Sequence, residues 1–211
     1  MVGQGVLKEC LDDPGVTSVL AVGRGSCAVE HDKLREVIHD DFFDYSRIAD
    51  DLTGYDACFF CLGVSAAGMR EEQYHHLTYE LTVRTAETLV ELNPNMTFCY
   101  VSGVGTDSTE SGRIMWARVK GKTENRLMRL PFKAVYLFRP GYIQPLKGIR
   151  SKTRIYRVVY TLVGPLFPLL KILFPKYVTT TEKVGRAMLR VASGGYPRNV
   201  LENRDINAMA A

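Results

Sequence analysis

The feature that most constrains this chain is an alternation of short apolar runs with longer stretches of helical periodicity. The apolar runs are rich in valine and aromatic residues, as buried strands are, and cover 16–22, 36–38, 57–62, 97–101 and 134–138. Helical patterns precede or separate them at 2–11, 71–92 and 114–130. Because parallel strands are joined by crossover helices, this alternation predicts an α/β fold with a doubly wound parallel sheet.

Composition is compatible with this prediction. The chain has 211 residues, of which 46% are hydrophobic and 24% charged, as expected for one globular domain or one domain with an added lobe. These values exclude a disordered tail, a collagen-like fibre and a small disulfide-stapled scaffold. The five cysteines are odd in number and scattered, which favours reduced thiols and a cytoplasmic setting.

Two pairs of residues invite a metal or redox interpretation that the pattern does not support. Cys58 and Cys61 fall on a predicted strand, where positions i and i+3 point to opposite faces, so we expect them to be small core hydrophobes. No second ligand pair follows at zinc spacing. His75 and His76 are neighbours on a predicted helix and should face different directions, so no role is assigned to them.

Positive charge is concentrated in one segment. The net charge is +4, but residues 146–176 contain seven lysines and arginines and no acid, which leaves a net charge of −3 elsewhere. The uncharged stretch within it, Val158 to Leu170, is 13 residues long and is interrupted by Pro165 and Pro168. A membrane-spanning helix needs about 20 residues. The segment therefore predicts either a helical lobe over a substrate site or a peripheral contact with an anionic bilayer through 150–176. It does not favour nucleic acid, because the basic residues are not interleaved with aromatic stacking positions on a strand.

Two glycines open the first predicted helix, and no strand precedes it. Gly3 and Gly5 resemble the second half of a glycine-rich dinucleotide loop, which brings a pyrophosphate to a helix N-terminus; a flexible chain end is the alternative. In a doubly wound sheet the strand before that loop is central. We therefore expect this first strand, within about ten residues before Met1, to be absent from the chain.

The ends of the next two predicted strands carry charged residues. Arg24 stands where NAD enzymes of this architecture place an acid for the ribose 2′-hydroxyl, and a basic residue suits a 2′-phosphate instead. This position favours NADP, with NAD as the alternative. Asp41 and Phe42 follow the next strand, where a carboxylate can accept a hydrogen bond from an adenine amino group or can simply close a turn.

Several motifs, in this order and spacing, carry a resemblance to a known family. They are Gly3-Gln4-Gly5-Val6, Cys61-Leu62-Gly63, Tyr100-Val101-Ser102-Gly103, 118–124 (RVKGKTE) and Phe138-Arg139-Pro140-Gly141. Together they resemble the atypical short-chain dehydrogenase/reductase superfamily, most closely its NAD-dependent epimerase/dehydratase-like group, which includes the Tat-interacting oxidoreductase-like proteins. The resemblance implies a Rossmann-like dinucleotide-binding core at 1–145, a basic and apolar helical lobe at 146–178, and a C-terminal helix and tail at 179–211 that packs back on the core.

The same resemblance implies a catalytic Tyr-x-x-x-Lys pair on one helix face, in which the lysine holds the cofactor ribose and lowers the pKa of the tyrosine. Lys120 matches the lysine, whereas Trp116 stands at the tyrosine position. An indole has no proton to exchange near neutral pH, so Trp116 cannot act as a general acid or base. Ser102 is the candidate for polarising a substrate oxygen, although the register leaves Gly103, Thr106 and Ser108 open, and Tyr142 is a further hydroxyl near that edge.

We therefore predict an NADP-binding oxidoreductase or epimerase-like protein that acts on a small or lipophilic carbonyl or alcohol. The alternative is a non-catalytic nucleotide-binding regulatory or scaffold protein, associated or not with a membrane surface. The expected catalytic residues are Lys120, Ser102 and Trp116, and no metal is expected. The expected cofactor contacts are Gly3, Gln4, Arg24, Asp41, Phe42, Cys61, Leu62, Gly63, Lys120, Pro140 and Gly141.

Overall fold

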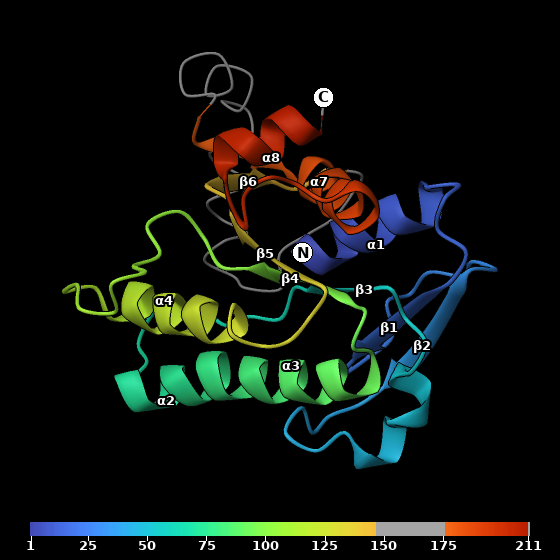
Figure 1. The fold of residues 1–211 in the computed structure, drawn as a ribbon, viewed down its shortest axis with the longest axis horizontal. Helices are drawn as coiled ribbons and strands as arrows, with labels where there is room; N and C mark the ends of the chain where they lie inside the picture. Colours follow the sequence, from blue (N-terminus) through green and yellow to red (C-terminus); the bar gives the residue numbers. More distant parts are fainter. Residues whose placement is uncertain (147–175, 211) are drawn as a thin grey trace.

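The computed structural model describes residues 1–146 and 176–210, and Figure 1 shows their arrangement. The N-terminal elements are α1 (Val2–Asp12), β1 (Val19–Gly23), β2 (Leu34–Ile38), two 3-10 turns (Ser46–Ile48 and Asp50–Leu52) and β3 (Ala57–Phe60). The middle of the chain forms α2 (Glu71–His75), the π-helical turn η3 (His76–Glu80), α3 (Leu81–Leu92), β4 (Thr97–Val101), α4 (Met115–Leu127), β5 (Ala134–Arg139) and β6 (Tyr142–Gln144). The C-terminal elements are β7 (Val178–Thr180), α7 (Thr181–Gly194), β8 (Val200–Glu202) and α8 (Asn203–Met209).

All strand pairs among the described residues are parallel, which confirms the predicted sheet type. The main sheet has the order β3-β4-β5-β8, with Phe98 of β4 opposite Cys58 of β3 and Val135 of β5. The strands β1 and β2 form a separate pair, and so do β6 and β7. No described strand pairs with both β1 and β3; a doubly wound sheet carries its first strand at that place.

Two helical layers cover the sheet. In Figure 1 the helices α2, α3 and α4 lie on one side of the strands, and α1, α7 and α8 lie on the other. Successive residues of β4 alternate between the layers: Phe98 and Tyr100 pack with Leu89 of α3, whereas Cys99 packs with Met188 of α7. This alternation follows from the period of two along a strand. Burial on both faces makes β4 and β5 continuous apolar runs and therefore easy to identify in the sequence.

The free cysteines follow the same rule. Cys58 packs against the core cluster on the α3 side of the sheet, and Cys61 packs against the cluster on the α7 side. The prediction that the two cysteines face opposite sides is therefore confirmed. Thr180 caps α7 by accepting a hydrogen bond from the backbone N–H of Lys183 at 3.2 Å.

Two expectations need correction. The helix expected at 71–92 contains the π turn η3, which brings both His75 and His76 to the carboxylate of Glu80, at 3.2 Å and 2.6 Å. The two imidazoles therefore do not face unrelated directions. The predicted strands end with 134–138, whereas β8 adds a fourth strand to the main sheet. Gly3 and Gly5 both lie within α1, in agreement with the helix predicted at 2–11.

The expected lobe at 146–178 and the expected membrane contact at 150–176 fall mainly on residues 147–175, which lie outside the described part of the chain. Among the described helices, none is both long and apolar enough to cross a membrane.

Candidate active site

The predicted site residues follow the carboxyl ends of the parallel strands. In the main sheet, Cys61 follows β3, Ser102 follows β4, and Pro140 and Gly141 follow β5. Arg24 is exposed directly after β1, and Asp41 follows β2. Ligands of open α/β sheets bind at this edge, where the strands end and the crossover helices begin.

The N-terminus of α1 lies at the end of β3. A Cβ atom on Gly3 would stand 3.3 Å from Cβ of Cys61, so the backbone of the helix passes close to the strand end there. Gln4 is exposed, and the first turn of α1 contains no acidic residue. The partial positive charge of a helix N-terminus is thus unopposed by side chains of that turn. Leu62 and Gly63, which continue from Cys61, are exposed.

Other residues predicted to contact the cofactor make contacts within the protein instead. The side chain of Phe42 lies in the core, with its ring centroid 5.6 Å from that of His39, so Phe42 can meet a ligand only through its backbone. Asp41 closes a turn by accepting a hydrogen bond from the backbone N–H of Phe43 at 2.9 Å. Gly141 donates its N–H to Oδ1 of Asn203 at 2.9 Å, and a Cβ there would stand 2.2 Å from the carbonyl oxygen of Tyr177.

Lys120 and Trp116 lie one turn apart on α4. The Lys120 ammonium donates a hydrogen bond to the backbone carbonyl of Ser102 at the end of β4. Burial lowers the pKa of Lys120 to about 8, against the opposing attraction of Glu124. The half-buried Trp116 ring reaches the loop after β4, where its Cη2 atom is 3.6 Å from the place a Cβ on Gly105 would take. The two side chains thus lie at the same strand end, as their spacing predicts.

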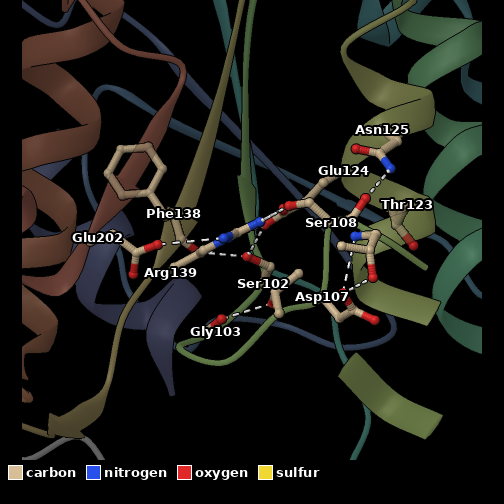
Figure 2. A network of polar contacts seen from close by, with 12 residues as sticks. Ser102, Gly103, Asp107, Ser108, Thr123, Glu124, Asn125, Phe138, Arg139 and Glu202 are labelled. Carbon is tan, nitrogen blue, oxygen red and sulfur yellow. Dashed lines mark hydrogen bonds and ion pairs between the residues drawn. The ribbon is translucent and has the colours of Figure 1, made fainter. Parts of the chain in front are cut away.

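The hydroxyl of Ser102 points into a buried polar network, shown in Figure 2. Ser102 is 6% exposed, and its Oγ donates to Oε1 of Glu124 at 2.5 Å, with the carbonyl of Phe138 at 3.1 Å. Gly103 has a φ of 147° and carries no side chain into this region. Thr106, one of the other candidate hydroxyls, donates to the carbonyl of Gly103 at 2.7 Å.

The ion pair of Glu124 and Arg139 is the centre of this network. Arg139 Nε donates to Oε1 of Glu124 at 3.0 Å, and its Nη2 donates to Oε2, so the guanidinium binds the carboxylate with two parallel bonds. Glu124 raises the pKa of Arg139 further by this contact. Arg139 Nη2 also donates to Oγ of Ser108 at 2.6 Å. Ser108, the remaining candidate hydroxyl in this loop, is therefore also engaged within the protein. Tyr142 donates to Oε1 of Gln144 at 3.0 Å.

Glu124 and Arg139 lie within the motifs that carry the family resemblance, but the sequence assigned no role to either residue. A carboxylate four residues after Lys120, on a helix face that is otherwise buried, was the available signal. The partner could not be read from the sequence, because Arg139 is brought to Glu124 only by the packing of α4 on β5.

Five of the seven large apolar side chains that are exposed among the described residues lie at the end of β2, in the loops after β3 and β4, or just before α4. They are Ile38 (59% exposed), Leu62 (39%), Val64 (37%), Val104 (43%) and Ile114 (58%). Apolar groups around a few polar ones are typical of a small-molecule site. Among the described residues, no group of three or more histidine, cysteine or acidic side chains could hold a metal ion.

Comparison with known proteins gives two kinds of similarity. The chain is 26% identical over 143 residues to protein HTATIP2 of Rattus norvegicus, covering 67% of this chain and 58% of that protein. It is 26% identical over 196 residues to the mitochondrial protein FMP52 of Debaryomyces hansenii, covering 92% of this chain and 84% of the relative. The resemblance expected from the motifs is confirmed.

Solved structures show the same fold. WbmF of Bordetella bronchiseptica in complex with NAD+ superposes with a TM-score of 0.66 and 15% identity over 98% of this chain and 73% of that one. DesIV of Streptomyces venezuelae, a dTDP-glucose 4,6-dehydratase with NAD and TYD bound, superposes with a TM-score of 0.63 and 15% identity over 99% and 77%. The chain therefore shares the Rossmann-like fold of these NAD-bound structures. No protein-family model matches the chain.

Proposed function

We propose that this chain binds a nicotinamide dinucleotide at the carboxyl edge of its sheet and works as an oxidoreductase or epimerase-like protein on a small or lipophilic carbonyl or alcohol. The observation that supports this proposal best is the position of Lys120. Its ammonium is hydrogen-bonded to the end of β4, one helical turn from Trp116 and at the sheet edge where exposed apolar side chains lie. The NAD-bound structures of the same fold support this proposal.

The residues present fit such a cofactor. Lys120 would hold the ribose next to the nicotinamide, and the N-terminus of α1 at Gly3 would face the pyrophosphate, where helix N–H groups favour anions. Arg24 is exposed after β1 and would meet a 2′-phosphate, which is the reason to propose NADP over NAD. The cofactor supplies hydride chemistry when bound. Leu62, Val64 and Ile114 would cover apolar parts of the ligands.

A second candidate, a nucleotide-binding regulator or scaffold without turnover, is favoured by two specific observations. Trp116 has no proton to exchange near neutral pH. The hydroxyl of Ser102 is engaged with Glu124 inside the protein instead of facing a ligand. A reduction that proceeds in this site would need its proton from a group other than these two.

Titration with NADPH and NADH tests both candidates. Trp116 is the only tryptophan, so its emission should be quenched when a nicotinamide binds within a few ångströms, with energy transfer to the reduced cofactor. Absence of any change in folded protein contradicts the cofactor proposal. If binding occurs, the variant Trp116→Tyr separates the candidates: reductase activity in Trp116→Tyr alone identifies the native chain as a binder, whereas activity in both identifies an enzyme.

Two further expectations concern location. The basic segment 150–176 predicts co-sedimentation with anionic liposomes that weakens with salt, and no binding at low salt contradicts it. A cytoplasmic location is proposed from the reduced thiols, whereas the FMP52 relatives are named mitochondrial. Cell fractionation of the tagged protein decides between the two.

A further inference from the structure

We propose that Glu124 is a positioning residue for Lys120. Glu124 fixes the end of β4, to which the Lys120 ammonium is hydrogen-bonded, and it places a negative charge one helical turn from that ammonium. The inference deepens the proposed function, because Lys120 is the residue proposed to hold the cofactor ribose. It also concerns the protein without any cofactor, so it can be tested separately.

The geometry links the two side chains through one residue. Glu124 follows Lys120 by four positions on α4, so both lie on the helix face that packs on the sheet. Glu124 Oε1 accepts the hydroxyl proton of Ser102 at 2.5 Å, while the backbone carbonyl of Ser102 accepts the bond from Lys120. Ser102 is therefore held on its side chain by Glu124, as Figure 2 shows, and on its backbone by Lys120.

Glu124 is itself held in place. Glu124 is 1% exposed, and the two parallel hydrogen bonds from the Arg139 guanidinium fix the orientation of its carboxylate. Arg139 is anchored in turn by Ser108 and, at 3.4 Å, by Glu202 on β8. The carboxylate consequently cannot swing toward or away from Lys120, and its distance from the ammonium is set by the backbone of α4.

The charges around Lys120 give this position an effect. Burial lowers the pKa of Lys120 and the attraction of Glu124 raises it, so removal of that charge should lower the pKa further. Tyr100 of β4 also faces Glu124 and, beyond it, Tyr74 of α2; burial raises the pKa of Tyr100, which keeps it uncharged at neutral pH. The charged groups beside Glu124 are Arg139 of β5, paired in turn with Glu202 of β8. The titratable groups of the helices packed on α4 pair with its other side chains: Glu71 with Arg118, Glu87 with Arg126 and His75 with Lys122.

A purely structural role is the competing explanation, since a buried ion pair also joins α4 to β5. The two roles separate in a double variant. Replacing both members of a buried ion pair by apolar residues often preserves stability, because no buried charge is left unpaired. The double variant also loses the Arg139 guanidinium, so it is compared with Arg139→Met. If Glu124 only joins the elements, Lys120 titrates alike in Glu124→Leu/Arg139→Met and Arg139→Met. If Glu124 positions and charges Lys120, the double variant titrates lower than Arg139→Met.

The readout is the pH dependence with which trinitrobenzenesulfonate labels Lys120 in cofactor-free protein, followed by peptide mass spectrometry. Wild type should titrate near the pKa of about 8. With the charge removed we expect a decrease of about one unit, which raises the neutral fraction at about pH 7 from about one tenth to about one half and labelling about fivefold. Glu202→Gln is the matched control, because it removes the more distant and more exposed carboxylate that contacts Arg139.

Each outcome decides the inference. A lowered labelling midpoint in Glu124→Gln relative to wild type, and in the double variant relative to Arg139→Met, with Glu202→Gln unchanged, supports it. A double variant that titrates like Arg139→Met overturns it, whatever Glu124→Gln does; should Glu124→Gln not fold, the comparison of the double variant with Arg139→Met gives the same decision. NADPH affinity at about pH 7 should weaken about twofold in Glu124→Gln if the lysine also holds the ribose, because the charged fraction of Lys120 falls from about nine tenths to about one half. A wild type that binds no nucleotide contradicts the proposed function and leaves the labelling result intact.

Discussion

Gly5 of α1 packs directly against Thr181, the first residue of α7: a Cβ atom on Gly5 would stand 2.5 Å from Cβ of Thr181 and 3.1 Å from its carbonyl oxygen. Both atoms of Thr181 belong to α7. This helix is held in place by its own packing, because Val184 and Met188 are fully buried in the core cluster on that side of the sheet. The requirement for glycine at this position therefore comes from the contact between the two helices.

We predict that Gly5→Ala destabilises the fold. The added methyl group must push α1 away from α7, and overpacking of this kind costs about 1–3 kcal/mol. Urea unfolding followed by circular dichroism measures the effect. Gly194→Ala at the end of α7 is the control, because a Cβ there meets nothing within 4 Å, and it should be neutral or slightly stabilising. Equal stability of the two variants contradicts the packing argument.

The buried amine predicts a pH dependence of stability. The pKa of Lys120 is about 8 in the folded protein and 10.5 ordinarily, so between these values the unfolded chain binds more protons. The free energy of unfolding should therefore rise with pH through this window, and the destabilising charge is fully present below about pH 8. Urea unfolding at about pH 7.5 and 9 in wild type and Lys120→Met checks this. The contribution is assigned wrongly if Lys120→Met shows the same rise as wild type.

Thiol reactivity should be confined to one cysteine. Burial raises the pKa of Cys10, Cys58 and Cys61 to about 12 and that of Cys99 well above its ordinary value. Iodoacetamide at about pH 8 should therefore modify native protein rapidly only at Cys27, which lies in the loop after β1, and all five thiols after unfolding. Mass spectrometry gives the count, and Cys27→Ser is the control. Rapid alkylation of that variant would show that the core opens easily.

Arg24 should set the choice of cofactor. Arg24→Glu places a carboxylate where the 2′-phosphate of NADP would lie and where NAD enzymes place their acid, so NADPH affinity should fall at least about tenfold while NADH affinity holds or rises. Quenching of Trp116 gives both dissociation constants. An Arg24→Glu variant with unchanged preference places the 2′-phosphate elsewhere.

Much of the fold could be predicted from the sequence because its signals are local. The strands β4 and β5 are buried on both faces and read as apolar runs, and their predicted and observed bounds agree to within one residue. The helix α4 was likewise placed by its periodicity, with Trp116 and Lys120 on one face. The weaker signals failed: β8 has three residues and no periodicity, and the π turn at 76–80 inserts one residue into an otherwise regular helix.

The sequence by itself determined the parallel alternation and placed Trp116 and Lys120 one turn apart on one helix, whereas the ligand site at the carboxyl edge stays a prediction. Only the tertiary structure decided that β1 and β2 form their own sheet, that Phe42 lies in the core and that the hydroxyl of Ser102 is engaged with Glu124. The reason is range. Hydrophobic periodicity records which face of an element is buried, whereas the contact of Glu124 with Arg139 depends on how two elements approach across the sheet.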